Sequence, residues 1–256
     1  MPSVLVIIPA HNEAENLPHV LPAVREAVPD ADILIIDDHS ADATSAVAGQ
    51  LGATVVRLPN NLGYGGAVQT GFRFGTRHGY AYGVVMDADG QHDPRNVPDL
   101  LAHVQKDGCD VVIGSRFIGE MTYHASWVRR LGMRMFAAIA GYLTRRPVTD
   151  ATSGFQAMTG EVMGFLATED YPSDYPDADT LIMLHYAGFC VQEVPVTMHE
   201  RISGVSMHGS IFKNLYYIPK MLLSMAIVYF RYHTLAGAQR NATRHFDDQR
   251  EEKSPA

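Results

Sequence analysis

The sequence predicts an α/β fold, in which a mainly parallel β-sheet is flanked by helices and followed by a C-terminal helical segment. Five short apolar runs rich in β-branched residues have the length of buried strands; they are residues 4–8, 33–36, 55–58, 84–86 and 111–113. The segments between them are long enough for a helix, and this alternation is typical of βαβ units with a sheet covered on both faces. Polar residues follow the runs, as expected where a ligand binds beyond the strand ends.

Helix start signals stand in two of the connecting segments. Asn16 is a typical N-cap residue and predicts a helix toward residue 28, in which Pro22 predicts a kink or a later start. Asp93 followed by Pro94 forms an N-cap and first-turn pair, and it predicts a helix that ends near residue 108. Both signals support the βαβ interpretation of the first half.

The alternation of strands and helices stops after residue 115. A helix rich in Met, Phe and Ala covers about residues 127–143, a second helix covers about 178–187, and a strand covers about 190–196. A loop at 150–154 lies between the two helices. We expect this half of the chain to form one side of the ligand site.

Composition and charge restrict the class of function. The formal net charge is −8 and no basic face is evident, which argues against nucleic-acid binding. The run at 4–8 is too short for a signal peptide and lacks its flanks, so it is interpreted as the first strand. Cys109 and Cys190 stand in apolar runs without a partner nearby in the sequence, which indicates two buried thiols and a cytoplasmic location.

Polar side chains follow four of the apolar runs. They are His11, Asn12 and Glu13 after the first run, Asp37 and Asp38 after the second, Asn60, Asn61 and Gly63 after the third, and Asp87, Asp89 and Gln91 after the fourth. The carboxyl ends of parallel strands meet along one edge of a sheet, so these residues should converge. A cleft with so many carboxylates repels an anionic ligand unless a cation intervenes.

The segment Asp87-Ala88-Asp89 predicts a divalent metal site. Side chains at i and i+2 of an extended segment face the same way, so both carboxylates can reach one cation. Mg²⁺ and Mn²⁺ prefer oxygen ligands and complete their shell with water and substrate phosphates, and Gln91 offers a further oxygen. The alternative interpretation is a turn ahead of Asp93, but the position after a buried strand favours the metal site.

Glycines and arginines supply the predicted anion contacts. Four glycines between residues 60 and 71 allow the backbone to approach a ligand ahead of a helix N-terminus, although a tight connection would use the same residues. Guanidinium groups suit phosphate oxygens, and the arginines expected near a pyrophosphate or an acceptor phosphate are Arg116, Arg129, Arg130 and Arg201. For Arg129, a solvated helix face explains the residue equally well.

Seven segments spread over residues 3–209 form a specific set of motifs. They read VIIPAHNEAENL at 6–17, IIDDHSADAT at 35–44, NLGYGGAVQTGF at 61–72, VVMDADGQHDP at 84–94, VVIGSRF at 111–117, DATSGFQAM at 150–158 and EVPVTMHERISGVSMHG at 193–209. This set resembles family 2 glycosyltransferases of the GT-A fold, and more closely the branch of dolichol- and polyprenol-phosphate sugar synthases. The resemblance implies a GT-A type, Rossmann-like sheet and a transferase that uses a nucleotide-diphosphate sugar with Mg²⁺ or Mn²⁺.

The resemblance also implies a role for each predicted site residue. The donor-binding set is Pro9, Glu13, Asp38, Gly63, Arg130 and Arg201, the metal ligands are Asp87, Asp89 and Gln91, and the acceptor side is shaped by Asp150 and Ser153. Asp87, Asp89 and Arg116 are the catalytic residues, joined by a carboxylate at Asp177 or Asp179, where many family members carry Glu. Arg201 is expected on a loop that closes over the donor.

The expected reaction is an inverting transfer from a GDP- or UDP-linked sugar. The metal and the arginines stabilise the departing nucleoside diphosphate while an acceptor oxygen attacks the anomeric carbon from the opposite face. A polyprenyl or dolichyl phosphate acceptor needs no base, whereas a soluble or cell-surface hydroxyl would need Asp177 or Asp179 as general base. The alternative of another class is a non-catalytic nucleotide-sugar-binding subunit, against which the intact carboxylate set argues.

The C-terminal segment bears on the choice of acceptor. Residues 211–232 are apolar with Lys213, Lys220 and Arg231 at intervals, which predicts an interfacial helix on a membrane surface or a membrane subunit. The alternative is a helix packed on its own domain or on a partner in a homo-oligomer. The sequence thus predicts a GT-A domain at 1–209, an amphipathic or interface helix at 210–235 and a disordered tail at 236–256, with the protein cytoplasmic and peripheral at the inner face of a membrane.

Overall fold

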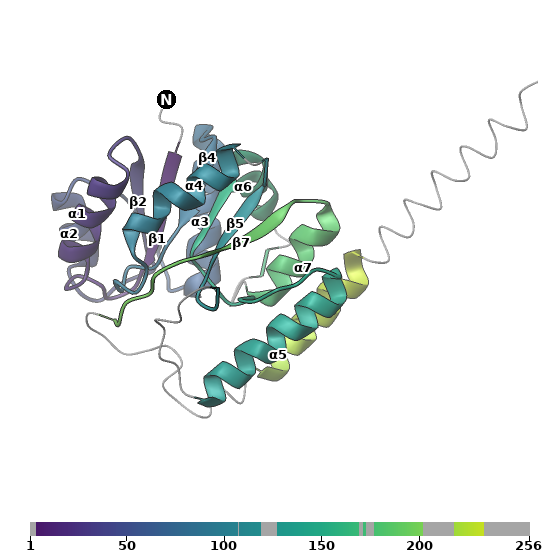
Figure 1. The fold of residues 1–256 in the computed structure, drawn as a ribbon. Coiled ribbons are helices and arrows are strands. Elements are labelled where there is room, and N and C mark those ends of the chain that lie inside the picture. The colour runs from purple at the N-terminus through teal and green to yellow at the C-terminus, as the bar shows by residue number, and fades with distance from the viewer. Residues whose placement is uncertain are drawn as a thin grey trace, which may run out of the picture.

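The computed structural model describes residues 4–106, 108–118, 127–168, 171–172, 177–201 and 218–232. A seven-stranded sheet with the strand order β3-β2-β1-β4-β6-β5-β7 runs through the described part of the chain. Helices cover the sheet on both faces, with α4 in front of it and α3 behind it in Figure 1. The predicted α/β fold with a mainly parallel sheet is confirmed.

The predicted strands are all present. β1 (Val4–Ala10), β2 (Asp32–Asp37), β3 (Thr54–Arg57), β4 (Tyr82–Val85), β5 (Val111–Ser115) and β7 (Val191–Pro195) pair in parallel wherever they are neighbours. One strand was not predicted: β6 (Gln156–Thr159) runs antiparallel between β4 and β5. Its four residues carry no β-branched run, so only pairing with its two neighbours identifies it as a strand.

The helices are α1 (Leu17–Ala27), α2 (Thr44–Gln50), α3 (Gly63–His78), α4 (Val97–Lys106), α5 (Trp127–Thr144), α6 (Gly160–Leu166) and α7 (Ala178–Ala187). The predicted N-cap at Asp93 is confirmed, because its side chain accepts a hydrogen bond from the backbone N–H of Arg95 at 3.0 Å. The predicted later start at Pro22 is wrong, because α1 runs through that residue. Both Pro22 and Pro18 are exposed, so water can solvate the Pro18 carbonyl that lacks a helical donor.

Alternate residues of the central strands point to opposite faces of the sheet and belong to two separate hydrophobic cores. Val6 and Ile8 of β1 pack with α1 and α4, whereas Leu5 and Ile7 pack with α3 and α6. A Cβ atom on Gly71 of α3 would clash with the side chain of Ile7, so glycine allows this helix to lie close against β1. The close approach holds the start of α3 near the carboxyl ends of the strands.

A helix over residues 218–232 packs on the second half of the domain. It buries Met221, Met225 and Val228 in the core that also contains residues of α5 and α7, and Figure 1 shows it at the same end of the molecule as α5. Among the described residues, none of the helices combines the length and the apolar character required to cross a bilayer. The rest of the predicted 210–235 segment and the predicted tail at 236–256 lie outside the described residues.

The two cysteines differ from the prediction. Cys109 is buried, but Cys190 is exposed, and their sulfur atoms lie 2.9 Å apart. The prediction of two buried thiols without a neighbour is therefore wrong for Cys190. The pairing of β5 with β7 brings the residues together, and this contact is not visible in the sequence.

Candidate functional site

The predicted acidic residues gather at the carboxyl ends of three neighbouring strands. Glu13 follows β1, Asp38 follows β2, and Asp87 and Asp89 follow β4; β2, β1 and β4 are consecutive in the sheet. Glu13 experiences the negative charges of Asp89 and Asp87 and the positive charge of Arg201. Four residues predicted from separate motifs, Glu13, Asp87, Asp89 and Arg201, therefore share one electrostatic environment.

Asp89 is buried between a backbone amide and an arginine. Its Oδ1 accepts a hydrogen bond from the N–H of Gln91 at 2.9 Å, and its Oδ2 lies 2.6 Å from Nη2 of Arg201. Burial raises the pKa of Asp89, and the negative charge of Asp87 acts in the same direction. Two adjacent carboxylates in this setting are favourable only beside a positive charge, which Arg201 supplies here.

The donor atoms fit a hard divalent cation. Asp87 Oδ1 is buried and has no hydrogen-bond partner among the described residues. That part of the chain contains no group of three His, Cys, Asp or Glu side chains that could hold a metal ion, so a site here would consist of two carboxylates and the amide of Gln91. Mg²⁺ and Mn²⁺ often take a few protein oxygens and complete their shell with phosphates and water.

His92 positions the aspartate segment; the sequence set it apart from the other loop histidines only by its place beside the predicted metal site. Its Nδ1 accepts a hydrogen bond from the backbone N–H of Asp87 at 2.9 Å, and its Nε2 lies 3.7 Å from Asp87 Oδ2. The ring is buried and stacks on Phe155 with centroids 4.7 Å apart. His92 has no second histidine at a metal-ligand spacing. Its role depends on a turn that brings its ring back to the backbone of Asp87, five residues earlier.

Asp38 holds the start of α3. Its two carboxylate oxygens accept hydrogen bonds from the backbone N–H groups of Leu62 at 2.6 Å and Gly63 at 2.9 Å. Gly63 has φ +80°, a left-handed conformation that suits glycine. The carboxylate thus orients the glycine-rich turn, and its predicted contact with the donor stays a prediction.

Glu13 lies at the end of β1 and is fixed by its neighbours. Its backbone N–H donates to Thr44 Oγ1 at 2.9 Å, and its carboxylate accepts a hydrogen bond from the Asn16 amide. Asn16 therefore stands at the N-cap position of α1 without capping it through its side chain. Burial raises the pKa of Glu13. Pro9 is buried within β1, opposite Ile36 of β2.

Arg116 and Asp150 form a buried bidentate ion pair. Nε and Nη2 of Arg116 each lie 2.6 Å from a carboxylate oxygen of Asp150, and the Arg116 backbone N–H donates to the same carboxylate at 3.0 Å. Nη2 also donates to Thr152 Oγ1 at 2.7 Å. The predicted phosphate-binding arginine and the predicted acceptor-side aspartate are thus joined, a pairing that the sequence did not indicate.

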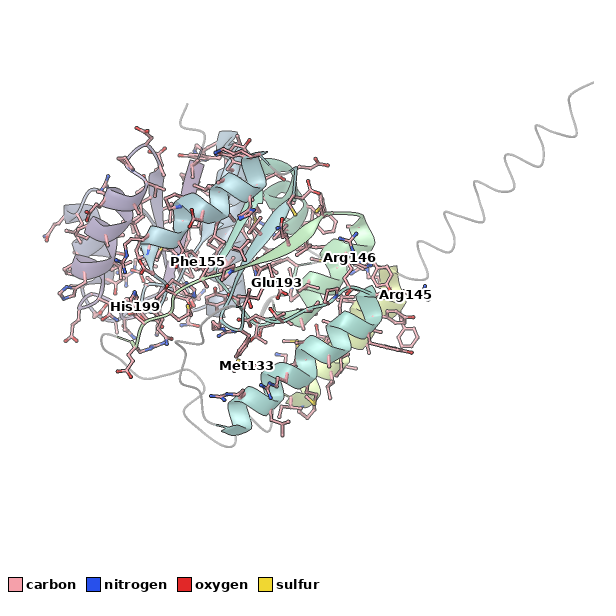
Figure 2. The ribbon with its side chains drawn as sticks, in the orientation of Figure 1. Met133, Arg145, Arg146, Phe155, Glu193 and His199 are labelled. Carbon is pink, nitrogen blue, oxygen red and sulfur yellow. The ribbon has the colours of Figure 1, made fainter. Side chains whose placement is uncertain are left out.

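Glu193 and Ser153 brace the loop that carries Asp150. Glu193 on β7 accepts hydrogen bonds from the backbone N–H groups of Thr149 at 2.8 Å and Asp150 at 2.7 Å. Ser153 donates its hydroxyl to the carbonyl of Gly114 on β5 at 2.6 Å. Figure 2 shows Glu193 over the sheet, with His199 on the segment that follows β7. Glu193 opens the last motif, but its role depends on the β5–β7 pairing.

The remaining predicted residues lie in the second half. Asp179 is buried and accepts hydrogen bonds from Ser224 in the helix at 218–232 and from the backbone N–H of Thr180 at 2.8 Å. Burial raises the pKa of Asp179. Asp177 is half-buried at the start of α7. Nε of Arg130 on α5 is buried without a hydrogen-bond partner among the described residues, and the side chain of Arg129 lies outside them.

Comparison with known proteins agrees with the motifs. The model of glycosyl transferase family 2 matches residues 5–164. The chain is 37% identical over 216 residues to polyprenol monophosphomannose synthase of Mycolicibacterium smegmatis. The matched region covers 80% of this chain and 81% of that protein. It is 35% identical over 224 residues to undecaprenyl-phosphate mannosyltransferase of Micrococcus luteus, which covers 81% of this chain and 88% of that protein.

Solved structures agree on the fold. Glucosyl-3-phosphoglycerate synthase from Mycobacterium tuberculosis, in complex with Mn²⁺, uridine diphosphate and glucosyl-3-phosphoglycerate, superposes with a TM-score of 0.67 at 17% identity. The match covers 89% of this chain and 80% of that chain. At this identity the likeness supports the architecture alone. With the family model and the two sequence relatives, it establishes that this chain belongs to the family 2 glycosyltransferases and has the GT-A fold that its motifs predicted.

Proposed function

We propose that this glycosyltransferase moves a sugar from a GDP- or UDP-linked donor to a polyprenyl phosphate, with inversion at the anomeric carbon. The observation that carries the proposal is the Asp87, Asp89 and Arg201 cluster at the strand ends, in a chain whose relatives are named for polyprenol-phosphate mannosyl transfer. The cluster is suited to a diphosphate, because two carboxylates hold a cation and an arginine stands beside them.

On the donor side, Asp87, Asp89 and Gln91 would hold Mg²⁺ or Mn²⁺. A bound divalent cation neutralises charge that develops on the departing nucleoside diphosphate. Arg201, whose Nη2 lies 2.6 Å from Asp89 Oδ2, would stand beside the diphosphate and supply a positive charge to it. Glu13 and Asp38 contact the base and ribose, and Pro9 and Gly63 shape the adjoining backbone.

On the acceptor side, a phosphate needs no general base. A phosphate monoester already carries between one and two negative charges near neutral pH, so orientation by arginine matters more than deprotonation. Arg130, which the motifs place in the donor-binding set, could equally serve the acceptor phosphate, because its buried Nε lacks a hydrogen-bond partner among the described residues. Asp150 and Ser153 hold the acceptor loop, and Asp177 or Asp179 would act as base only with a hydroxyl acceptor.

The C-terminal helix would place the enzyme against the membrane that contains its lipid acceptor. Leu223 is 62% exposed and Phe230 is 66% exposed, and Leu222 and Ile227 of the same helix are also exposed. Residues 121–149 and 202–246 contain no Asp or Glu and five Lys or Arg each, although the whole chain has a net charge of −8. An apolar face within an acid-free, cationic region favours an anionic membrane surface.

Donor and acceptor identity are tested together. The purified enzyme is incubated with UDP- and GDP-sugars and Mn²⁺, with and without a short polyprenyl phosphate, and the anomeric configuration of the product is read by NMR. Transfer that depends on the lipid phosphate supports the proposal. Donor hydrolysis with transfer only to hydroxyl acceptors would replace it with the alternative acceptor class, and binding of donor without turnover would indicate a non-catalytic subunit.

The metal assignment has its own test. Asp89→Ala should abolish metal-stimulated transfer and metal binding measured by calorimetry, with an unchanged circular dichroism spectrum. Asp99→Ala is the matched control, because Asp99 is an exposed carboxylate on α4. Arg201→Ala should weaken donor binding without preventing metal binding. Normal metal dependence in Asp89→Ala would remove this residue from the site.

Membrane docking is tested by sedimentation with vesicles. The unmodified enzyme should bind phosphatidylglycerol vesicles more strongly than phosphatidylcholine vesicles, and less strongly as salt increases. The triple variant Leu223→Ser, Ile227→Ser and Phe230→Ser should lose vesicle binding but keep transfer to a short, water-soluble acceptor. Unchanged binding to vesicles would show that this helix face is not the docking surface.

A further inference from the structure

The two cysteines of the chain meet at the beginnings of two paired strands. Cys109 precedes β5 and Cys190 precedes β7, and their sulfur atoms lie 2.9 Å apart although the residues are separated by 81 positions. The backbone N–H groups of Asp110 and Val111 both donate to the Cys190 carbonyl at 3.0 Å. The Cys190 N–H donates to the Asp110 carboxylate at 2.8 Å. The main chain is therefore held in place on both sides of the sulfur pair.

We propose that Cys109 and Cys190 form a reversible disulfide when the protein meets a low-molecular-weight disulfide such as oxidised glutathione. The sulfur atoms of a disulfide lie about 2.05 Å apart, so the pair at 2.9 Å must close by roughly 0.9 Å. The two sulfur atoms already lie in contact beside main chain that is held by hydrogen bonds, so rotation of the two side chains supplies this movement.

Exposure determines the order of the steps. The Cys190 thiol is exposed, so its thiolate attacks one sulfur of the oxidised reagent and releases the first reduced thiol. Cys109 then loses its proton to water, attacks Cys190 Sγ and releases the second thiol. The protein gives up two electrons and two protons, and one molecule of reagent is reduced to two thiols. Burial and the hydrogen bond with Cys190 raise the pKa of Cys109 to about 12, so the closing step is slow near neutral pH.

The bond would enclose the acceptor half of the domain. The segment between the two cysteines contains α5, β6, α6 and α7, together with Arg116 and Asp150. Cross-links that close long loops remove the most freedom from the unfolded chain. The oxidised protein should therefore unfold at a higher temperature than the reduced protein, with no change in its native strand pairing.

The experiment exposes the reduced full-length protein to excess oxidised glutathione at mildly alkaline pH. Free thiols are counted in denaturant, the intact mass is measured, and a non-reducing peptide map identifies linked residues. We expect both thiols to disappear together, the mass to fall by two hydrogen atoms, one linked peptide pair and a higher melting temperature, all reversed by dithiothreitol. Oxidation should proceed faster as pH rises, because more Cys109 is then deprotonated.

Two variants make the result unambiguous. Cys190→Ser should keep one thiol and show no change in melting temperature after treatment, and Cys109→Ser should keep a glutathione adduct on Cys190. Three results in the unmodified protein would overturn the proposal: a lasting glutathione adduct on Cys190, dimers linked through Cys190, or two thiols that survive treatment. Since Cys190 lies outside the proposed active site, this outcome is independent of the transferase assay.

Discussion

Two arginine–aspartate pairs in this protein have the same contact distance and a buried aspartate, but only one of the two arginines is buried. Nη2 lies 2.6 Å from a carboxylate oxygen both in Arg116–Asp150 and in Arg95–Asp93, and in both pairs Nε also donates to the aspartate. The side chain of Arg116 is 7% exposed, whereas that of Arg95 is 79% exposed. Comparison of Arg116→Met with Arg95→Met therefore separates the effect of burial from that of contact geometry.

The buried pair should dominate stability. Loss of one partner of a buried ion pair costs about 3–5 kcal/mol, because the remaining charge stays in a low dielectric. Methionine retains most of the apolar stem of arginine, so little packing is lost with it. Each kcal/mol lowers the melting temperature of a domain of this size by about 2–4 °C, so Arg116→Met should unfold about 6–20 °C below the unmodified chain. Arg95→Met should change it less, because the exposed guanidinium is solvated and the Asp93 carboxylate keeps the backbone N–H of residue 95 at 3.0 Å and the His199 ring nitrogen at 3.0 Å as partners.

Thermal and urea unfolding, followed by circular dichroism, measure both variants. Raising the salt concentration should leave the deficit of Arg116→Met nearly unchanged, because a buried pair is weakly screened. Adding Asp150→Asn to Arg116→Met should recover part of the loss, since the amide oxygen still accepts the backbone N–H of residue 116 and no charge remains. Equal melting temperatures for the two single variants would refute the reasoning.

Three further predictions concern single side chains. Gly154→Ala should lower the transfer rate about 10- to 100-fold at nearly constant melting temperature, because the new methyl group displaces the Tyr64 hydroxyl beside Asp87, a carboxylate of the proposed metal site. Steady-state kinetics check this. Asp179→Asn should raise the free energy of unfolding at neutral pH. Burial raises the pKa of Asp179, so ionisation of this carboxyl disfavours the folded state above that raised pKa. In urea titrations the advantage of Asp179→Asn should shrink as pH falls below the raised pKa and vanish near the ordinary value of 3.8. Glu193→Gln should cost about 1–3 kcal/mol, because the amide replaces one of two acceptors for the loop before Asp150; an unchanged urea midpoint would contradict this.

Local patterns in the sequence were sufficient for most of the sheet. The runs that became β1, β2, β4 and β5 are buried on both faces. A strand buried on both faces is a continuous apolar, β-branched run, so its position in the sequence can be predicted to within a few residues. The cap at Asp93 is equally local, because its donor lies two residues away. The polar residues after these runs were also visible in the sequence, and the family motifs added their expected roles and the expected type of reaction.

Contacts between distant residues could not be read in the same way. Arg116 was predicted as a phosphate ligand, but the structure engages it with Asp150, 34 positions further along the chain. Asp38 and Glu193 likewise use their carboxylates to hold backbone amides of other segments. A charged side chain has the same sequence signal whether it binds a ligand or another part of the fold, so the role depends on what packs beside it.

The sequence by itself therefore determined the family, the parallel half of the sheet and the set of carboxylates at its edge. Only the tertiary structure decided that β6 inserts antiparallel between β4 and β5, that Arg201 pairs with Asp89, and that the sulfur atoms of Cys109 and Cys190 are in contact. The physical reason is the sequence separation over which each interaction acts. Hydrophobic periodicity and capping act over a few residues, whereas strand insertion, ion pairing and sulfur contact depend on chain segments that meet only when the two cores form.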